Sequence, residues 1–150
     1  MERIWWLLMN IVKIMTQLLK LNEKEKSENI IYQEINENVY LALNSYNIFI
    51  IPSENFFIDM NKIKHRKHNL KELIGEDKGQ FAVKTNEQRI INKTTAIKIA
   101  SDDKYAWVDT KLLTEYSNNC TYTITDDKSP VYIYKDDVLE GVVLPIEIRM

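Results

Sequence analysis

Apolar residues in the first 21 positions of the chain recur at helical spacing. Their steps of three, four and one place six of them on one face of a helix, namely Ile4, Leu8, Ile11, Met15, Leu18 and Leu19. Polar side chains such as Lys13 and Gln17 fall on the opposite face, and Trp5 and Trp6 widen the apolar end. This pattern predicts an amphipathic helix, followed by a solvated charged linker over residues 22–28.

Three interpretations of this helix stay open. It packs on the core of the domain or on a second copy of the chain, it lies in a membrane interface, or translation starts at Met9 or Met15 and the upstream residues are not native. A membrane span is not expected, because Asn10, Lys13 and Gln17 interrupt the run well short of about 20 apolar residues. A secretory signal is not expected either, since no small-residue cleavage site follows.

In the middle of the chain, short apolar runs are separated by turn residues, a pattern typical of short strands. The predicted elements are a β-hairpin over 39–51 with its turn at 44–47, a break at 52–55, a third short strand over 56–60, a helical turn over 69–74, a loop over 75–79 and an extended segment over 81–83. In the helical turn, Leu70, Leu73 and Ile74 are expected to point inward.

The C-terminal third alternates more regularly. In the run 94–100, Ile97 and Ile99 alternate against Lys98, which predicts a strand. Asp109 is expected to cap a helix of about two turns, because its carboxylate can accept the free amide hydrogens of the first turn. That helix carries Leu112, Leu113 and Tyr116. The remaining predicted strands are 105–108, 121–125, 131–134 and 142–148, the last three as an antiparallel meander.

These elements predict an α+β fold, with a twisted antiparallel sheet and two or three short helices on one face. We expect one domain over residues 27–150, preceded by the amphipathic helix and charged linker of residues 1–26. The chain has 150 residues, 45% hydrophobic and 28% charged, which fits one globular domain and excludes wholesale disorder.

The block 94–150 resembles the last part of a bacterial DNA polymerase sliding clamp, the beta subunit. After a helix with a Leu-Leu pair come the runs SPVYI at 129–133 and VVLPIEIR at 142–149, in the order in which that family ends. Small uncharacterised phage proteins of Firmicutes also look similar. A clamp subunit has three such domains and basic helices around DNA, whereas Lys111 is the one basic residue of the predicted helix. The resemblance therefore implies the fold and partner binding rather than encirclement of DNA.

In sliding clamps the last strand helps to form a cleft for partner peptides. The resemblance therefore implies partner contacts by Val143, Pro145 and Met150. Alternate residues of a strand share one face, so Leu144 and Ile146 are expected to lie together, in the core. Pro145 has no amide hydrogen to donate and is expected at a sheet edge or facing away from the partner strand.

Charge points to one further candidate surface. The 20 basic and 22 acidic residues give a net charge of -2, so no overall positive field marks the chain as nucleic-acid-binding. Five cations nevertheless gather within residues 62–71, and these are Lys62, Lys64, Arg66, Lys67 and Lys71. They are expected to be exposed, either as a contact to the DNA backbone or as a solvated loop or helix face. His65 and His68 lie among them, but a metal site needs a third ligand that the sequence does not offer nearby.

Nothing in the sequence predicts an enzyme. The Asp pairs at 102–103, 126–127 and 136–137 fall in turns, where Asp favours local backbone hydrogen bonds. Cys120 is the single cysteine, so disulfides and cysteine-based zinc sites are excluded and a reducing cytoplasm is expected. No catalytic residue, cofactor or metal is predicted.

Ile, Asn and Lys make up a third of the chain. Because their codons are rich in A and T, the source is expected to be an AT-rich bacterium or its phage. The sequence thus predicts a non-enzymatic, sliding-clamp-like phage or mobile-element protein that acts in DNA replication, alone or as a homo-oligomer, in the host cytoplasm. The alternative is a small phage protein that binds and inhibits a host factor, such as a defence protein.

Overall fold

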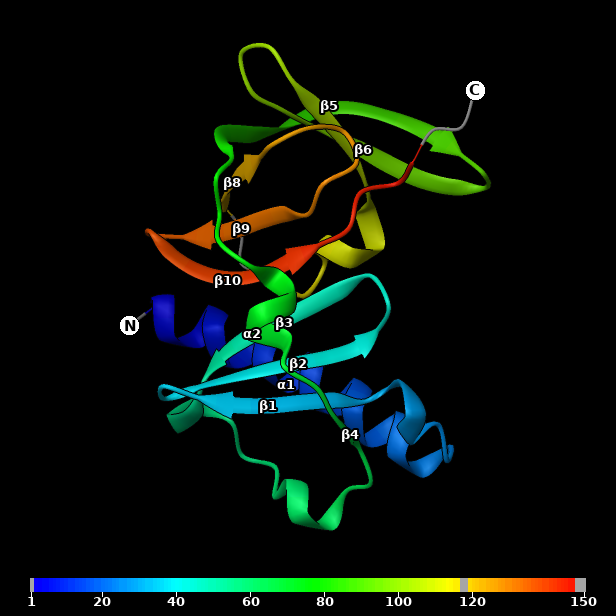
Figure 1. Ribbon diagram of the computed structural model, residues 1–150, viewed down its shortest axis with the longest axis vertical. Helices are drawn as coiled ribbons and strands as arrows, with labels where there is room; N and C mark the ends of the chain where they lie inside the picture. Colours follow the sequence, from blue (N-terminus) through cyan, green and yellow to red (C-terminus); the bar gives the residue numbers. More distant parts are fainter. Residues whose placement is uncertain (1, 117–118, 148–150) are drawn as a thin grey trace. The chain divides into compact units, whose positions relative to one another are not determined.

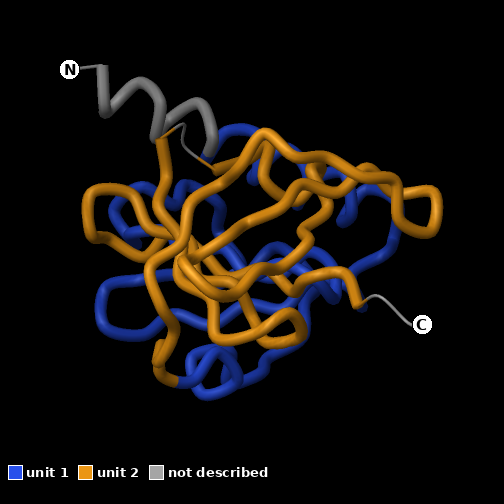
Figure 2. Tube along the Cα trace, turned by 90° about the horizontal axis from the view of Figure 1, so that it is seen from above, with its two compact units in different colours: residues 1–75 blue, residues 76–150 orange. Residues whose placement is uncertain are grey.

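The computed structural model describes residues 2–116 and 119–147, and the side chains from residue 11 onward within those ranges. The chain divides into two compact units, Met1–Gly75 and Glu76–Met150, which Figures 1 and 2 show. Both units combine strands with helical segments, which confirms the predicted α+β class. The single domain expected over residues 27–150 stays a prediction.

Unit 1, residues 1–75, is a four-stranded sheet with helices packed on it. Its elements are α1 (Glu2–Glu23), the 3-10 turn η1 (Ser27–Asn29), β1 (Ile31–Ile35), β2 (Asn38–Asn44), β3 (Asn47–Pro52), the 3-10 turns η2 (Ser53–Asn55) and η3 (Met60–Lys62), β4 (Arg66–Lys67) and α2 (Leu70–Ile74). The strand order is β4-β1-β2-β3. β1, β2 and β3 are antiparallel neighbours, and β4 runs parallel to β1.

The predicted amphipathic helix is confirmed as α1. Its buried side chains in the described part are Ile11, Ile14, Met15 and Leu18. Leu19, which we placed on the apolar face, is 49% exposed, because each residue turns the helix by about 100° away from its predecessor. Ile4 and Leu8 lie outside the described side chains. No helix in the described ranges is long and apolar enough to cross a membrane.

The predicted hairpin over 39–51 is confirmed as β2 and β3. β2 is buried continuously from Val39 to Leu43 rather than at alternate positions. The reason is that α1 and α2 both contact this strand, with α1 behind it and α2 in front in Figure 1. A strand covered on both faces has a continuous apolar run instead of an alternating one.

Two predictions in unit 1 are wrong. Residues 56–59 form no strand, and the chain there is irregular until η3 begins at Met60. The Asp59 side chain caps η3 by accepting the Asn61 amide hydrogen at 3.0 Å. In the short helix α2, Leu70 and Ile74 are buried one turn apart, whereas Leu73 lies beside this stripe and is exposed.

Unit 2, residues 76–150, contains six antiparallel strands among its described residues. Its elements are β5 (Gln80–Ile91), β6 (Thr94–Ala100), β7 (Tyr105–Asp109), the 3-10 turn η4 (Thr110–Leu113), β8 (Thr121–Ile124), β9 (Val131–Lys135) and β10 (Val138–Val143). The strand order is β10-β9-β8-β5-β6-β7. β5 pairs with β8 through residues 80–82 and with β6 through residues 83–91, with a bulge between Lys84 and Gln88.

Beyond β10 the chain runs to β7, which is at the other end of the strand order of unit 2. There the Ile146 amide donates a hydrogen bond to the Trp107 carbonyl of β7 at 2.7 Å. Ile146 also packs on a small cluster of buried residues, Ile91, Ala96 and Trp107. The sheet of unit 2 is therefore rolled, and residues 144–147 connect its first strand in the order, β10, to its last, β7.

This path corrects the predicted final strand. β10 pairs antiparallel with β9, with Val143 opposite Val131 and Val142 opposite Tyr132, which confirms the expected pairing for these positions. Residues 144–147 are not part of the strand. Pro145 cannot donate to a ladder, and the chain leaves β9 at this point. Leu144 is exposed, so its expected core position is wrong, while Ile146 is partly buried as expected.

The predicted two-turn helix after β7 is a single 3-10 turn, η4. The capping role of Asp109 is confirmed, because its carboxylate accepts the Lys111 amide hydrogen at 2.9 Å. The region 94–100 matches β6 in its bounds, and Tyr122 and Ile124 are buried on the same face of β8 as expected.

Three of the two-residue hairpin turns share one backbone geometry, and none of the three contains glycine. Both central residues of each turn have positive φ, and these pairs are Asn36 and Glu37, Asn92 and Lys93, and Asp136 and Asp137. This is the type I′ geometry, whose twist matches that of the flanking strands. Asn or Asp occupies the first central position in each case, which lowers the cost of the left-handed conformation.

Candidate nucleic-acid interface

The basic segment, defined as Lys62, Lys64, Arg66, Lys67 and Lys71, is held in place by its backbone. Arg66 lies opposite Ile31 and Lys67 opposite Tyr32 in the parallel pairing of β4 with β1. The Arg66 amide donates to the Ile30 carbonyl at 2.8 Å. Apolar residues between and beside the cations anchor the segment, since Ile63 and Leu70 are buried. The chain therefore fixes the backbone and leaves the cationic side chains at the surface.

All five cations of the basic segment are exposed, which confirms the expected exposure. In the described part of the chain, none of them forms an ion pair with a carboxylate. The Arg66 guanidinium makes one contact, a hydrogen bond of 3.4 Å to the backbone carbonyl of Glu28, which leaves its charge uncompensated. The segment thus presents five cationic side chains to solvent, none of them in an ion pair within the described ranges.

An aromatic cluster lies against the basic segment. It consists of Tyr32, Phe56 and His65. The Tyr32 ring lies 5.8 Å from the Phe56 ring and 5.4 Å from the His65 ring, the latter edge-on. The Tyr32 hydroxyl donates to the Glu34 carboxylate at 3.4 Å. Burial, and then the charge and hydrogen bond of Glu34, raise the pKa of Tyr32, so the hydroxyl stays protonated. Phe57 follows Phe56 directly and is 68% exposed.

The two histidines of this region do not form a metal site with their neighbours. His65 Nδ1 donates to the Ile63 carbonyl at 2.7 Å, while His68 is exposed. Across the described ranges, no three or more His, Cys, Asp or Glu side chains lie close enough together to hold a metal ion.

The partner-contact residues implied by the resemblance do not form a common surface. Val143 is fully buried, so its expected surface position is wrong. Pro145 is buried as well, and Met150 lies outside the described residues. The reason is the turn of the chain away from β9, which places residues 144–147 along β7.

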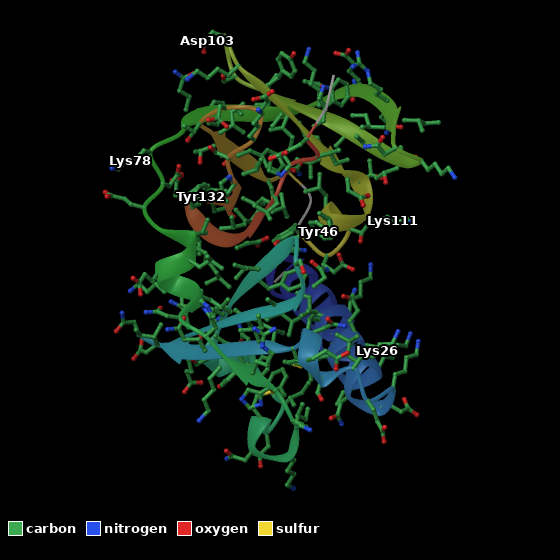
Figure 3. All side chains as sticks on the ribbon, turned by 45° about the vertical axis from the view of Figure 1, so that its right-hand side comes forward. Lys26, Tyr46, Lys78, Asp103, Lys111 and Tyr132 are labelled. Carbon is green, nitrogen blue, oxygen red and sulfur yellow. The ribbon has the colours of Figure 1, made fainter. Side chains whose placement is uncertain are left out.

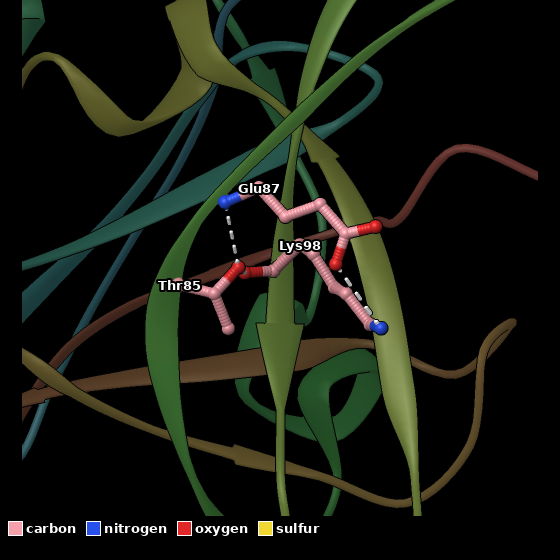
Figure 4. A network of polar contacts seen from close by, with 3 residues as sticks. All are labelled: Thr85, Glu87 and Lys98. Atoms are coloured by element: carbon pink, nitrogen blue, oxygen red, sulfur yellow. Dashed lines mark hydrogen bonds and ion pairs between the residues drawn. The ribbon is translucent and has the colours of Figure 1, made fainter.

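Two cationic side chains of unit 2, Lys98 and Arg89, have internal partners. The Lys98 ammonium pairs with the Glu87 carboxylate at 3.3 Å, and Thr85 joins the two strands beside it (Figure 4). Lys98 also lies 4.8 Å from the Tyr105 ring, and Arg89 lies 4.8 Å from the Trp107 ring. These cations stabilise the β5 bulge and its neighbours, in contrast with the basic segment of unit 1.

Unit 2 also contains a polar cluster centred on the Asp77 carboxylate. One oxygen accepts hydrogen bonds from the Thr123 hydroxyl at 2.5 Å and the Tyr134 hydroxyl at 2.6 Å, and the other accepts the Gly79 amide hydrogen at 2.9 Å. Partial burial raises the pKa of Asp77, but the three hydrogen bonds together outweigh it, so the pKa is lowered. Burial and the bond to Asp77 raise the pKa of Tyr134. The carboxylate is thus held charged and ties the loop before β5 to β8 and β9.

Two further groups of unit 2, Cys120 and Asp126, also have pKa values that are shifted by their surroundings. Burial, and then the charge of Glu140, raise the pKa of Cys120 to about 12, which keeps the thiol protonated and a poor nucleophile. The Asp126 carboxylate accepts the amide hydrogens of Lys128 at 2.8 Å and Ser129 at 2.6 Å, and these bonds lower its pKa. The predicted turn role of this Asp pair is therefore confirmed for Asp126.

The aromatic cluster was not predicted from the sequence. Tyr32 and His65 lie far apart in the chain and meet only because β4 pairs with β1. The run Phe56-Phe57 matches the pattern of a strand, and a strand at this place does not predict the contact of Phe56 with Tyr32. The one available signal was that adjacent aromatics stand a few residues before a basic run.

Comparisons with family models, curated proteins and solved structures found no match to this chain. The sliding-clamp resemblance of residues 94–150 therefore stays a prediction.

Proposed function

We propose that the protein is a non-enzymatic nucleic-acid-binding protein whose basic segment contacts the phosphate backbone without reading the base sequence. The observation that supports this proposal is the set of five exposed cations with no ion pair in the described ranges. The sliding-clamp resemblance is the reason to assign this binding to DNA replication in a phage or mobile element.

Charge distribution supports a localised contact. The whole chain carries a net charge of -2 although five of its 20 basic residues lie in the basic segment. The rest of the chain therefore has an excess of negative charge, which would repel a polyanion from other surfaces and orient it toward this segment. For duplex DNA, five phosphate contacts would give a slope of log affinity against log salt of about −4.5.

The test is to neutralise the centre of the segment. In the variant K64Q/R66Q/K67Q, loss of three contacts should flatten the slope for duplex DNA to about −1.8. The measurement is fluorescence anisotropy of a short labelled duplex over a range of salt concentrations. Because the three side chains are exposed and the β4 pairing uses backbone groups, the fold should be retained, as circular dichroism would verify.

A matched control removes three exposed lysines from unit 2, in the variant K78Q/K104Q/K111Q. Figure 3 shows Lys78 and Lys111 projecting from the ribbon, and Lys104 is also exposed. This variant has the same net charge as K64Q/R66Q/K67Q, so an effect of total charge alone would be equal in both. The absence of any DNA binding at low salt, or an equal change of slope in both variants, would contradict the proposed function.

A further inference from the structure

The aromatic side chains beside the basic segment suggest which form of nucleic acid it binds. Phe57 is the most exposed aromatic side chain in the described ranges, at 68%, and it directly follows Phe56 of the aromatic cluster. A large apolar ring left in water gains from any partner with a flat apolar face. Unpaired bases have such a face, whereas the bases of a duplex already stack on one another.

Cations and aromatic residues lie next to one another in this part of unit 1. Tyr32 lies opposite Lys67 in the β1–β4 pairing, and the Tyr32 ring contacts those of Phe56 and His65. Grooves that bind single strands combine cations that follow the backbone with aromatic rings on which the bases stack. The basic segment and the aromatic cluster provide both components on one stretch of surface.

Resting on the proposed function, we infer that the ligand of this surface is single-stranded nucleic acid, with a base stacking on Phe57 while the cations of the basic segment contact the phosphates. Charge complementarity favours a polyanion as the ligand, and the exposed Phe57 ring favours a polyanion that has unpaired bases. Such binding tolerates any base sequence, because every base has a face that can stack.

The test compares Phe57→Ala with Phe81→Ala. Phe81 is a matched control, because it is 65% exposed and belongs to β5 of unit 2, away from the basic segment in the sequence. Binding of labelled oligothymidylate, oligouridylate and a DNA duplex is measured by anisotropy. Phe57→Ala should weaken single-strand binding roughly 5- to 150-fold, the range of one lost stacking contact. Duplex affinity and the salt slope should stay unchanged, because the phosphate contacts remain.

The outcomes separate the two proposals. If single strands and duplex bind equally tightly and Phe57→Ala affects neither, the basic segment binds phosphate but the stacking inference is overturned. Equal losses in Phe57→Ala and Phe81→Ala would also overturn it. If no nucleic acid binds, the proposed function fails together with the inference. The DNA and RNA oligonucleotides distinguish the two possible sources of unpaired bases, and either one supports the inference.

Discussion

Replacing Tyr134 by Phe removes one hydroxyl from the polar cluster around Asp77 and leaves the ring in place. The lost bond is short, at 2.6 Å, and its acceptor is charged, a combination that contributes about 1.5–3 kcal/mol in buried settings. Because Asp77 is only partly buried, solvent screening reduces this value. We therefore expect Tyr134→Phe to lower the free energy of unfolding by about 1 kcal/mol at neutral pH.

The same variant has a pH signature. The pKa of Asp77 is lowered in the folded state, so this group stabilises the fold fully above its unfolded pKa of about 3.9. That stability is lost as the pH falls through the folded pKa, because the carboxylate then binds a proton. The stability difference between wild type and Tyr134→Phe should therefore be constant near neutral pH and shrink below about pH 4.

Urea denaturation followed by tryptophan fluorescence at several pH values measures this difference, with an unchanged m-value as evidence that the unfolding transition is comparable. Tyr46→Phe is the control, since the Tyr46 hydroxyl is exposed in the β2–β3 turn and donates to no acceptor in the described ranges. The reasoning would be refuted if Tyr134→Phe cost no more than Tyr46→Phe, or if its cost stayed the same through acid pH.

Three further predictions concern packing, backbone and reactivity. Leu18→Ala should cost about 2–5 kcal/mol in urea denaturation because Leu18 is fully buried, whereas Leu19→Ala should cost far less; similar costs would contradict the burial pattern of α1. Lys93→Gly should raise stability by about 0.5–1 kcal/mol, because Lys93 has a φ of 66° that glycine adopts without strain; a loss of stability would contradict the turn geometry. The Cys120 thiol, with its pKa of about 12, should alkylate much more slowly in the native protein than in urea, and equal rates would contradict its burial.

The local sequence pattern was sufficient to predict an element wherever its conformation did not depend on a segment far away in the chain. The strand 94–100 was predicted with correct bounds, because Ile97 and Ile99 alternate against Lys98 and the flanking residues favour turns. The exposure of the basic segment followed from its charge, since cations are rarely buried without partners.

The errors arose where long-range packing decides the conformation. The apolar run 142–148 is compatible with a strand, but the strand pairing to β9 stops at Val143 and residues 144–147 are directed to β7. Residues 56–60 are apolar apart from Asp59 and do not alternate, and only the pairing of β4 with β1 places His65 against Tyr32. Neither pairing leaves a local signal in the sequence.

The link from residues 144–147 to β7 sets an order for folding during synthesis. All four strands of unit 1 precede β5 in the chain, so a ribosome delivers them before unit 2 begins. In unit 2, by contrast, the hydrogen bond from Ile146 to Trp107 forms only after every strand of that unit has been made. Until then the outer side of β7 has an open carbonyl at Trp107, and such edges pair readily with other nascent chains. The late-arriving segment therefore covers a strand edge that would otherwise stay open to pairing with another chain.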